Sequence, residues 1–299
     1  MEKKLWLRLS LYAVIIVMLC GLIFAIAQND KKLLAGYDSA SVAATAPPAT
    51  EKPAQTEQQT AATTAHWQSS DSLSFDTVEQ AEEYIADYAR KKGYDFNDYP
   101  EKLIELTVKD KTSIPFVLDY PEEIKKLHSS TVDKGELNNG IPLFLQWDSR
   151  WGYHEFKNGV VALDGCGATC LSMAAMYLTG DTSLTPDSIA DYAADNGYFV
   201  DGSGTSWDLF TSGVKHYGLK SKTVAKSEGA LKSALDGGSP VIASVSAGDF
   251  TKKGHYIVIT GYDEKGFKVN DPFSLVNSQK QWSYERLNPQ IKAMWKIYK

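Results

Sequence analysis

Cysteine is scarce in this chain, which has only three in 299 residues. Cys166 and Cys170 lie one helical turn apart on one predicted element, a geometry that disfavours a disulfide between them. Cys20 lies in an apolar run near the N-terminus. No Cys/His cluster has the spacing of metal ligands, and no motif calls for a cofactor. We therefore expect a fold without disulfide bridges, metal ions or cofactors.

Positive charge is also in short supply. The chain has 31 Lys and Arg against 37 Asp and Glu, a formal net charge of −6. No basic patch with interleaved aromatic side chains occurs, so we expect no nucleic-acid partner. The glycine-rich stretch 201–207 lacks the lysine and the preceding strand of a phosphate-binding loop. Apolar residues make up 43% of the chain, enough for one or two domains with a real core.

Long apolar runs are absent except near the N-terminus. Residues 9–27 carry no charge over 19 positions, close to the ~20 that a helix needs to span a bilayer. We predict that residues 1–32 form a membrane anchor. The alternative is a cleaved signal peptide, because Ala25-Ile26-Ala27 fits a small-x-small cleavage site. Basic residues precede the run, so both interpretations place the rest of the chain outside the cytoplasm, either on the cell membrane or secreted.

The next hundred residues divide into a linker and a helical subdomain. Residues 33–72 are rich in Ala, Thr, Gln and Pro and have too little apolar surface to fold, so we predict a disordered spacer. Residues 73–135 are predicted as a small helical subdomain, with helices over 77–89 and 100–109 and an extended arm over 114–121. So small a core favours packing on a larger domain. A docking scaffold and an inhibitory pro-segment are the two interpretations.

A Gly-Cys-Gly step opens the most informative stretch, residues 164–175. Apolar residues recur at helical spacing after Cys166, which predicts a buried helix over 166–178. The cysteine would lie in its first turn, where unpaired N–H groups and the positive end of the helix dipole favour a thiolate. The flanking glycines let the backbone turn sharply and keep bulk away from the sulfur. Taken alone, a cysteine such as Cys166 is more often a small apolar residue that caps a core helix.

Two further chemical groups follow on a predicted β-hairpin with strands over 254–262 and 267–272. His255 lies at the mouth of the first strand, and Asp271 ends the second. Such a hairpin holds the two side chains together near its open end, so that the acid orients the imidazole. The imidazole would then hold the thiolate of Cys166 and later protonate a leaving amine.

The rest of the domain begins with helices and ends with strands. We predict helices over 166–178, 186–196 and 228–235, and another that ends near Gly218, with Thr205 as its N-cap after the glycine-rich lead-in. Strands are predicted over 240–245 and 293–298, in addition to the hairpin. Helices followed by an antiparallel sheet indicate an α+β fold.

The order Gln146, Cys166, His255, Asp271 resembles the papain-fold cysteine peptidases of the branch that includes the bacteriocin-leader (double-glycine) peptidases. The matching text lies in about residues 141–299 and comprises Ile141-Pro142-Leu143-Phe144-Leu145-Gln146-Trp147-Asp148, Trp151-Gly152, Gly165-Cys166-Gly167-Ala168-Thr169, Gly254-His255-Tyr256 and Asn270-Asp271-Pro272. The resemblance implies a papain-like catalytic domain over 136–299. It also implies that Cys166 is the nucleophile, His255 the base, Asp271 its orienter and Gln146 the oxyanion-hole donor.

Two positions depart from the pattern of these enzymes. Gln146 lies twenty residues before Cys166, rather than the handful usual in papain-type enzymes, which weakens the oxyanion assignment. Ala168 stands where relatives often have proline, a change that should be harmless.

We therefore expect a membrane-tethered, extracytoplasmic thiol peptidase that hydrolyses peptide bonds in a peptide or protein substrate. Two other functions stay open. One is a cell-wall cysteine amidase or endopeptidase that acts on peptidoglycan peptides with the same Cys-His pair. The other is a peptide-binding module that keeps the fold without catalysis. No residue of the sequence can be assigned to a substrate pocket.

Overall fold

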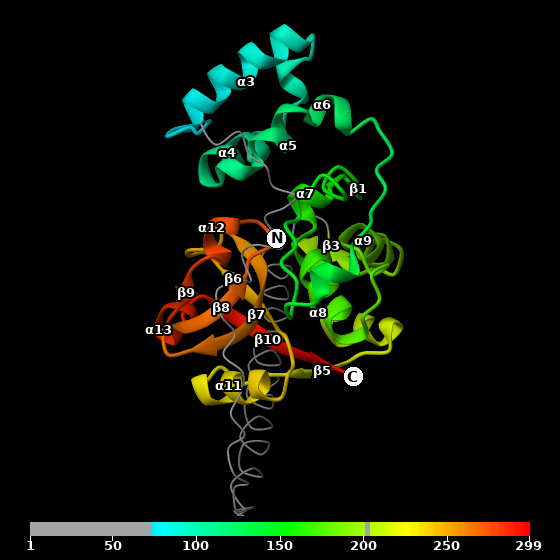
Figure 1. Ribbon diagram of the computed structural model, residues 1–299, viewed down its shortest axis with the longest axis vertical. Coiled ribbons are helices and arrows are strands. Elements are labelled where there is room, and N and C mark those ends of the chain that lie inside the picture. The colour runs from blue at the N-terminus through cyan, green and yellow to red at the C-terminus, as the bar shows by residue number, and fades with distance from the viewer. Residues whose placement is uncertain (1–72, 201–203) are drawn as a thin grey trace, which may run out of the picture. The chain divides into compact units, whose positions relative to one another are not determined.

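The computed structural model describes residues 73–200 and 204–299 (Figure 1). The predicted anchor over 1–32 and linker over 33–72 lie outside the described residues. No helix within the described ranges is both long and apolar enough to cross a membrane. The described part contains one six-stranded β-sheet, two two-stranded β-sheets and a series of helices. The large sheet is formed by the C-terminal third of the chain.

Six antiparallel strands make the large sheet, in the order β5-β10-β6-β7-β8-β9. Their bounds are β5 Lys220–Thr223, β6 Val241–Ser246, β7 Gly254–Asp263, β8 Gly266–Asn270, β9 Gln281–Trp282 and β10 Ile291–Tyr298. The predicted hairpin is β7 and β8, in which Asp263 pairs with Gly266 across a two-residue turn. β5 and β9 were not predicted, because β5 is mostly exposed and β9 has only two residues.

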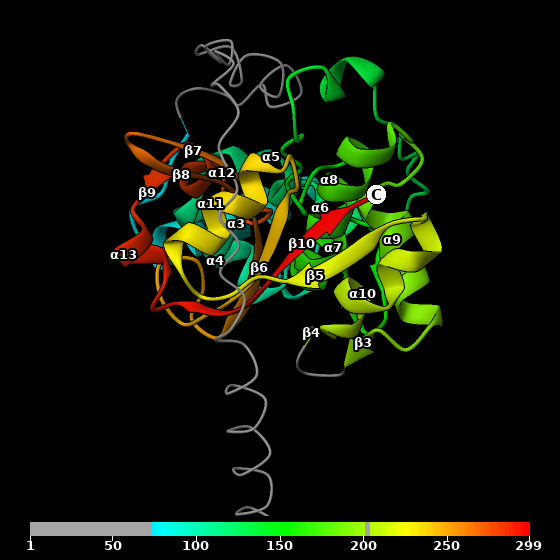
Figure 2. The same ribbon diagram turned by 90° about the horizontal axis from the view of Figure 1, so that it is seen from below.

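Helices cover both faces of this sheet, so its central strands are buried on both sides. Alternate residues of β6 enter different clusters: Ile242 packs with α8 (Cys166–Thr179), whereas Val241 and Ala243 pack with α11 (Glu228–Asp236). Figure 2 shows α11 on one side of β6 and β10, and α9 (Pro186–Asp195) and α10 (Asp208–Thr211) on the other. The predicted combination of helices with an antiparallel sheet is confirmed.

The remaining elements of the C-terminal part, which we call the catalytic part after the domain predicted over 136–299, are short. They are η4 Lys134–Leu137, α7 Val161–Asp164, η5 Gly213–Tyr217, α12 Leu275–Ser278, α13 Tyr284–Leu287, and the hairpins β1 Glu155–Phe156 with β2 Gly159–Val160 and β3 Phe199–Val200 with β4 Gly204–Thr205.

The predicted helix that ends near Gly218 is two pieces, α10 and η5, and Thr205 does not cap it. Thr205 pairs with Phe199 in a β-ladder instead, and the residue before α10 is Trp207. The backbone N–H of Asp208 donates a hydrogen bond to the hydroxyl of Ser206, rather than of Thr205, at 3.2 Å. The prediction was wrong because a long-range contact of Thr205, described below, fixes its backbone as a strand.

Both helices predicted for the helical subdomain are present. α3 (Val78–Lys92) begins after Thr77, whose hydroxyl accepts from the N–H of Gln80, and ends at Gly93 in the left-handed region with φ 76°. α4 (Glu101–Lys109) begins after Pro100 and buries Leu103 and Leu106. Short 3-10 turns follow each helix, at η2 (Phe96–Asp98) and η3 (Lys111–Ser113).

The predicted extended arm over 114–121 is wrong. The segment forms two short helices, α5 (Ile114–Leu118) and α6 (Tyr120–Glu123), each with a proline in its first turn. Proline is tolerated there because the first N–H groups of a helix have no intrahelical partner. Burial of Ile114 and Val117 on one side of α5 favours the helix.

The helical subdomain shares an apolar cluster with the catalytic part. Leu103, Leu106 and Phe116 are buried together with Leu145, Trp147, Tyr153 and Leu275. The Phe116 ring stacks on Tyr153 at 4.1 Å between centroids, and the Tyr153 hydroxyl donates to the Phe116 carbonyl at 2.9 Å. Packing of the helical residues on the catalytic part is therefore as predicted, whereas the choice between scaffold and inhibitory segment stays a prediction.

Candidate active site

Cys166 is the first residue of α8, directly after the N-cap Gly165. Its side chain is half-buried, whereas Cys170 one turn later is fully buried. The first N–H groups of an α-helix have no intrahelical acceptor, and the dipole of a 14-residue helix places positive potential at this end. The fold therefore puts one accessible thiol where a negative charge is stabilised.

The glycines beside Cys166 serve close packing rather than a sharp turn. Gly165 lies between α7 and α8 with φ −85°, and neither glycine has a positive φ, so the backbone here does not need the conformational freedom of glycine. A Cβ at Gly165 would lie 2.5 Å from the Val161 carbonyl oxygen, and a Cβ at Gly167 would lie 2.4 Å from the Thr205 hydroxyl. Both distances are too short for any larger residue without movement, so the glycines let two segments approach Cys166 closely.

His255 and Asp271 lie together, as the hairpin predicted. His255 is the second residue of β7 and pairs with Val245 of β6, and Asp271 directly follows β8. The His255 Nε2 and the Asp271 Oδ1 are 2.7 Å apart, and both side chains are buried. The Phe273 ring stands at 76° to the imidazole, with centroids 6.3 Å apart. The acid thus fixes the direction of the ring and leaves Nδ1 as the nitrogen open to another partner.

Asp271 is itself held by the segment that follows it. Its Oδ1 also accepts from the N–H of Phe273 at 2.9 Å, and its Oδ2 accepts from the amide Nδ2 of Asn277 at 2.9 Å. The N–H of Asp271 donates to the Ser278 hydroxyl at 2.9 Å. Neither Asn277 nor α12 was predicted to belong to the site. The one local signal is Ser274, whose hydroxyl caps the helix by accepting from the N–H of Asn277.

The imidazole of His255 favours its protonated form. Burial by itself lowers the pKa of His255, but the charge of Asp271, the hydrogen bond to Asp271 and a hydrogen bond with Cys166 together raise the pKa to about 10. Since Nε2 is bound to Asp271, Nδ1 is the ring nitrogen that remains for Cys166. The arrangement is a positive ring held between a carboxylate and a thiol.

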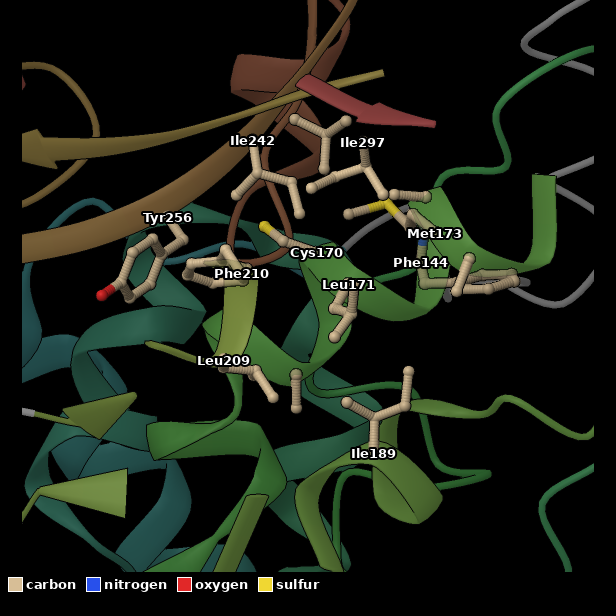
Figure 3. Close-up of a cluster of buried hydrophobic side chains, with 14 of the residues drawn as sticks. Phe144, Cys170, Leu171, Met173, Ile189, Leu209, Phe210, Ile242, Tyr256 and Ile297 are labelled. Atoms are coloured by element: carbon tan, nitrogen blue, oxygen red, sulfur yellow. Dashed lines mark hydrogen bonds between the residues drawn. The ribbon is translucent and has the colours of Figure 1, made fainter. Parts of the chain in front are cut away.

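Cys170 has the opposite environment. Burial raises the pKa of the Cys170 thiol well above its usual range, and the nearby Cys166 adds to this effect. Figure 3 shows its sulfur among apolar side chains that include Phe210 and Ile242. The prediction that Cys170 is shielded and has a raised pKa is confirmed.

Gln146 is buried beside the segment that leads to Cys166. Its Nε2 donates to the Ala162 carbonyl in α7 at 2.7 Å, while its Oε1 is buried with no hydrogen-bond partner. The backbone N–H of Gln146 donates to the Pro272 carbonyl at 2.7 Å, one residue after Asp271. A primary amide has two N–H donors, so the second remains for another acceptor. Donation to an oxyanion stays a prediction for this residue.

No group of three or more His, Cys, Asp or Glu side chains in residues 73–200 and 204–299 is placed to hold a metal ion. The chemical groups of the site are the thiol of Cys166, the imidazole of His255 and the carboxylate of Asp271.

Comparison with known proteins places the C-terminal half of the chain in a family. Residues 138–299, which contain all four predicted site residues, match the model of the Peptidase_C39 like family. No curated protein matches the chain. Among solved structures, the peptidase domain of Streptococcus ComA, a bi-functional ABC transporter involved in a quorum sensing pathway, is similar at 21% identity and a TM-score of 0.36, over 45% of this chain and 90% of that one. A putative C39-like peptidase from Bacillus anthracis is similar at 17% identity and a TM-score of 0.32, over 55% of this chain and 96% of that one.

Proposed function

Because the chain belongs to the Peptidase_C39 like family, we propose that it is a cysteine peptidase with Cys166 as nucleophile, His255 as general base and acid, and Asp271 as the residue that orients His255. The observation that carries the proposal is the buried imidazole of His255, which is bound to Asp271 at 2.7 Å and whose pKa is raised by both Asp271 and Cys166. The resemblance seen in the sequence and the family match agree on the reaction class.

The reaction follows from the charges at the site. A thiolate of Cys166, paired with the imidazolium of His255, attacks the carbonyl carbon of the scissile peptide bond. His255 then gives its Nδ1 proton to the leaving amine as the C–N bond breaks, which leaves a thioester on Cys166. The neutral imidazole next takes a proton from water, the hydroxide attacks the thioester, and the carboxylic acid product leaves as the thiolate forms again.

The developing oxyanion needs donors near the sulfur. The N–H of Cys166 itself, at the start of α8, points out of the helix and is one such donor. The second N–H of the Gln146 amide is the other donor in this proposal. Its first N–H on Ala162 would hold the amide in place, and Ala162 lies only four residues before the nucleophile.

We also propose that the enzyme works outside the cytoplasm, attached to the membrane by residues 9–27. The support is the uncharged run of 19 residues with basic residues before it, followed by a polar linker. In this arrangement the substrate is a peptide or protein at the cell surface.

The proposal is tested by measuring thiol labelling and peptide hydrolysis in two variants, in each of which one of the two cysteines is replaced. Cys166→Ala should abolish hydrolysis of peptide substrates and labelling by iodoacetamide at mildly acidic pH, because the thiolate is lost. Cys170→Ser is the matched control, because it removes the other thiol of the same helix. This variant should keep both the hydrolysis and the labelling. Labelling on Cys170, or hydrolysis retained by Cys166→Ala, would overturn the proposed mechanism.

The substrate class is tested by comparing wild-type cells with cells that carry Cys166→Ala. New protein N-termini that appear only in the wild type would support a protein-directed peptidase. Muropeptides released only by the wild type, without new protein ends, would instead show the cell-wall activity. Neither product, with labelling of Cys166 intact, would favour a binding module.

A further inference from the structure

We propose that Asp110, in the helical subdomain, is a positioning residue for the Asp271–His255 pair, and that the helical subdomain is therefore part of the framework of the active site. The inference deepens the proposed function and rests on it. It starts from a hydrogen bond that joins two residues 165 positions apart, Asp110 and Leu275.

Asp110 is a buried carboxylate whose two oxygens have different partners. Only 1% of the residue is exposed. Its Oδ1 accepts locally from the N–H of Thr112 at 3.1 Å and from the Thr112 hydroxyl at 2.5 Å. Its Oδ2 accepts from the backbone N–H of Leu275 at 2.7 Å. A charged acceptor this close to a backbone donor, away from water, makes one of the stronger kinds of hydrogen bond.

Leu275 is the first residue of α12, and its N–H is one of the donors that a helix cannot satisfy internally. A negative charge at this end is favourable for the helix. Because α12 has only four residues, its own hydrogen bonds are too few to fix its place. Its position is therefore set by what it touches, and Asp110 provides the polar part of that contact.

The same short helix holds the catalytic acid. Asn277, two residues after Leu275, donates its Nδ2 to the Asp271 Oδ2, and the Ser278 hydroxyl accepts from the Asp271 N–H. These bonds lie on the side of Asp271 away from His255, whose Nε2 uses Oδ1. Asp110 is thus connected to Asp271 and the imidazole by hydrogen bonds at Leu275 and Asn277 and by the backbone of α12 between these two residues.

Apolar contacts tie the same region to the helical subdomain. Leu275 is buried in one cluster with Leu103 and Leu106 of α4. The indole N–H of Trp147, in the same cluster, donates to the Phe273 carbonyl at 3.0 Å between Asp271 and α12. An inhibitory segment would lower activity by its presence, whereas these contacts predict that weakening the helical subdomain lowers activity.

The test changes Asp110 in the full chain and follows both turnover and the pH profile of Cys166 alkylation. Asp110→Ala should lower kcat by about 10²-fold, the loss typical of a catalytic group displaced by 1 Å, with KM nearly unchanged. Alkylation by iodoacetamide should also need a higher pH, because an imidazole less well held by Asp271 stabilises the thiolate less. A role limited to stability would lower Tm without moving the alkylation profile of the folded protein.

Two controls come from the same subdomain. Glu105→Gln removes a carboxylate that pairs with Lys252 of the catalytic part at 3.3 Å on the surface, and it should change neither kcat nor the profile. Thr112→Val removes a hydroxyl partner of the Oδ1 but leaves the bond to Leu275, and it should keep the wild-type profile. If Asp110→Ala does not fold, Asp110→Asn keeps the shape of the side chain and should shift the profile in the same direction by less.

An alkylation profile of Asp110→Ala or Asp110→Asn that coincides with the wild type would overturn the inference. The profile needs no substrate, so this outcome is distinct from a failure of the proposed function. That failure would show as absence of any Cys166-dependent hydrolysis by the wild type, while the shift caused by Asp110→Ala would still be measurable.

Discussion

At the scale of single residues, the site depends on how one buried imidazole is charged. Burial alone would favour the neutral ring, but Asp271 and Cys166 on either side raise the pKa of His255 to about 10. In the unfolded chain the pKa of a histidine is ~6.5. The pair therefore stabilises the folded state fully below about pH 6.5, and this contribution is lost as pH rises through about 10.

Asp271→Asn tests the acid directly. The variant keeps the shape and one acceptor but removes the charge, so kcat should fall by about 10²-fold to 10⁴-fold, as for loss of the charged acid from a comparable triad, with little change in KM. The loss of stability between pH 6.5 and 10 should also become smaller, as measured by urea unfolding at several pH values. The control is Asp263→Asn, at the exposed turn of the same hairpin. It should change neither kcat nor the dependence of stability on pH. Wild-type kcat in Asp271→Asn would mean that Asp271 only starts the turn at Pro272.

At the scale of elements, the start of α8 is fixed by a contact with a different segment. Gly167 lies against Thr205, and the Thr205 carbonyl accepts from the Tyr256 hydroxyl at 2.7 Å. Tyr256 is the neighbour of His255 on β7. The helix that bears Cys166 and the strand that bears His255 are thus held by the same short β4 strand.

Gly167→Ala tests this contact. The new Cβ would lie 2.4 Å from the Thr205 Oγ1 and 2.5 Å from its Cβ, so one segment must move. We expect a loss of about 1–3 kcal/mol in the free energy of unfolding, as for other overpacked sites, and lower kcat because Cys166 is adjacent.

Gly229→Ala is the matched control for this prediction. Gly229 is also the second residue of a helix, α11, but a Cβ there meets nothing within 4 Å. It should be neutral or stabilising by up to about 1 kcal/mol, the difference in helix propensity between Gly and Ala. Equal effects of the two substitutions would show that the contact with Thr205 has no energetic importance.

At the scale of the whole described molecule, the helical subdomain and the catalytic part share one apolar cluster. Phe116 is buried at this boundary, where a Cβ on Gly152 would lie 2.7 Å from its ring. The catalytic part contributes Leu275 of α12 and Ala162 of α7 to this cluster, and the helical subdomain contributes residues of α3, α4 and α5. Two parts that complete one another's core should unfold together.

Phe116→Ala should lower the free energy of unfolding by about 3–5 kcal/mol, and urea unfolding should remain a single transition by circular dichroism and by tryptophan fluorescence. Tyr84→Ala truncates an aromatic residue of α3 that is 41% exposed; it is the control and should cost much less. A separate early transition of the helices, with the catalytic part intact, would contradict the shared core.

Local sequence determined a large part of this protein. Apolar spacing and capping residues fixed α3, α4, α8 and the β7–β8 hairpin, because a helix or hairpin needs only neighbours in the chain to set its period and its ends. The hairpin in turn brought His255 beside Asp271. The motifs around Cys166 also indicated the family that the match over 138–299 shows. The anchor over 1–32 stays a prediction.

The tertiary structure decided what depends on residues far apart in the chain. The arm over 114–121 became helical because its apolar side chains are buried against the catalytic part, and Thr205 became a strand residue because it packs on Gly167. The partners of Asp271 and Gln146 likewise come from α12 and α7, and α12 depends on Asp110 for the N–H of Leu275. No local pattern encodes these contacts, since each is selected by the burial of a polar group or a side chain that only the folded chain creates.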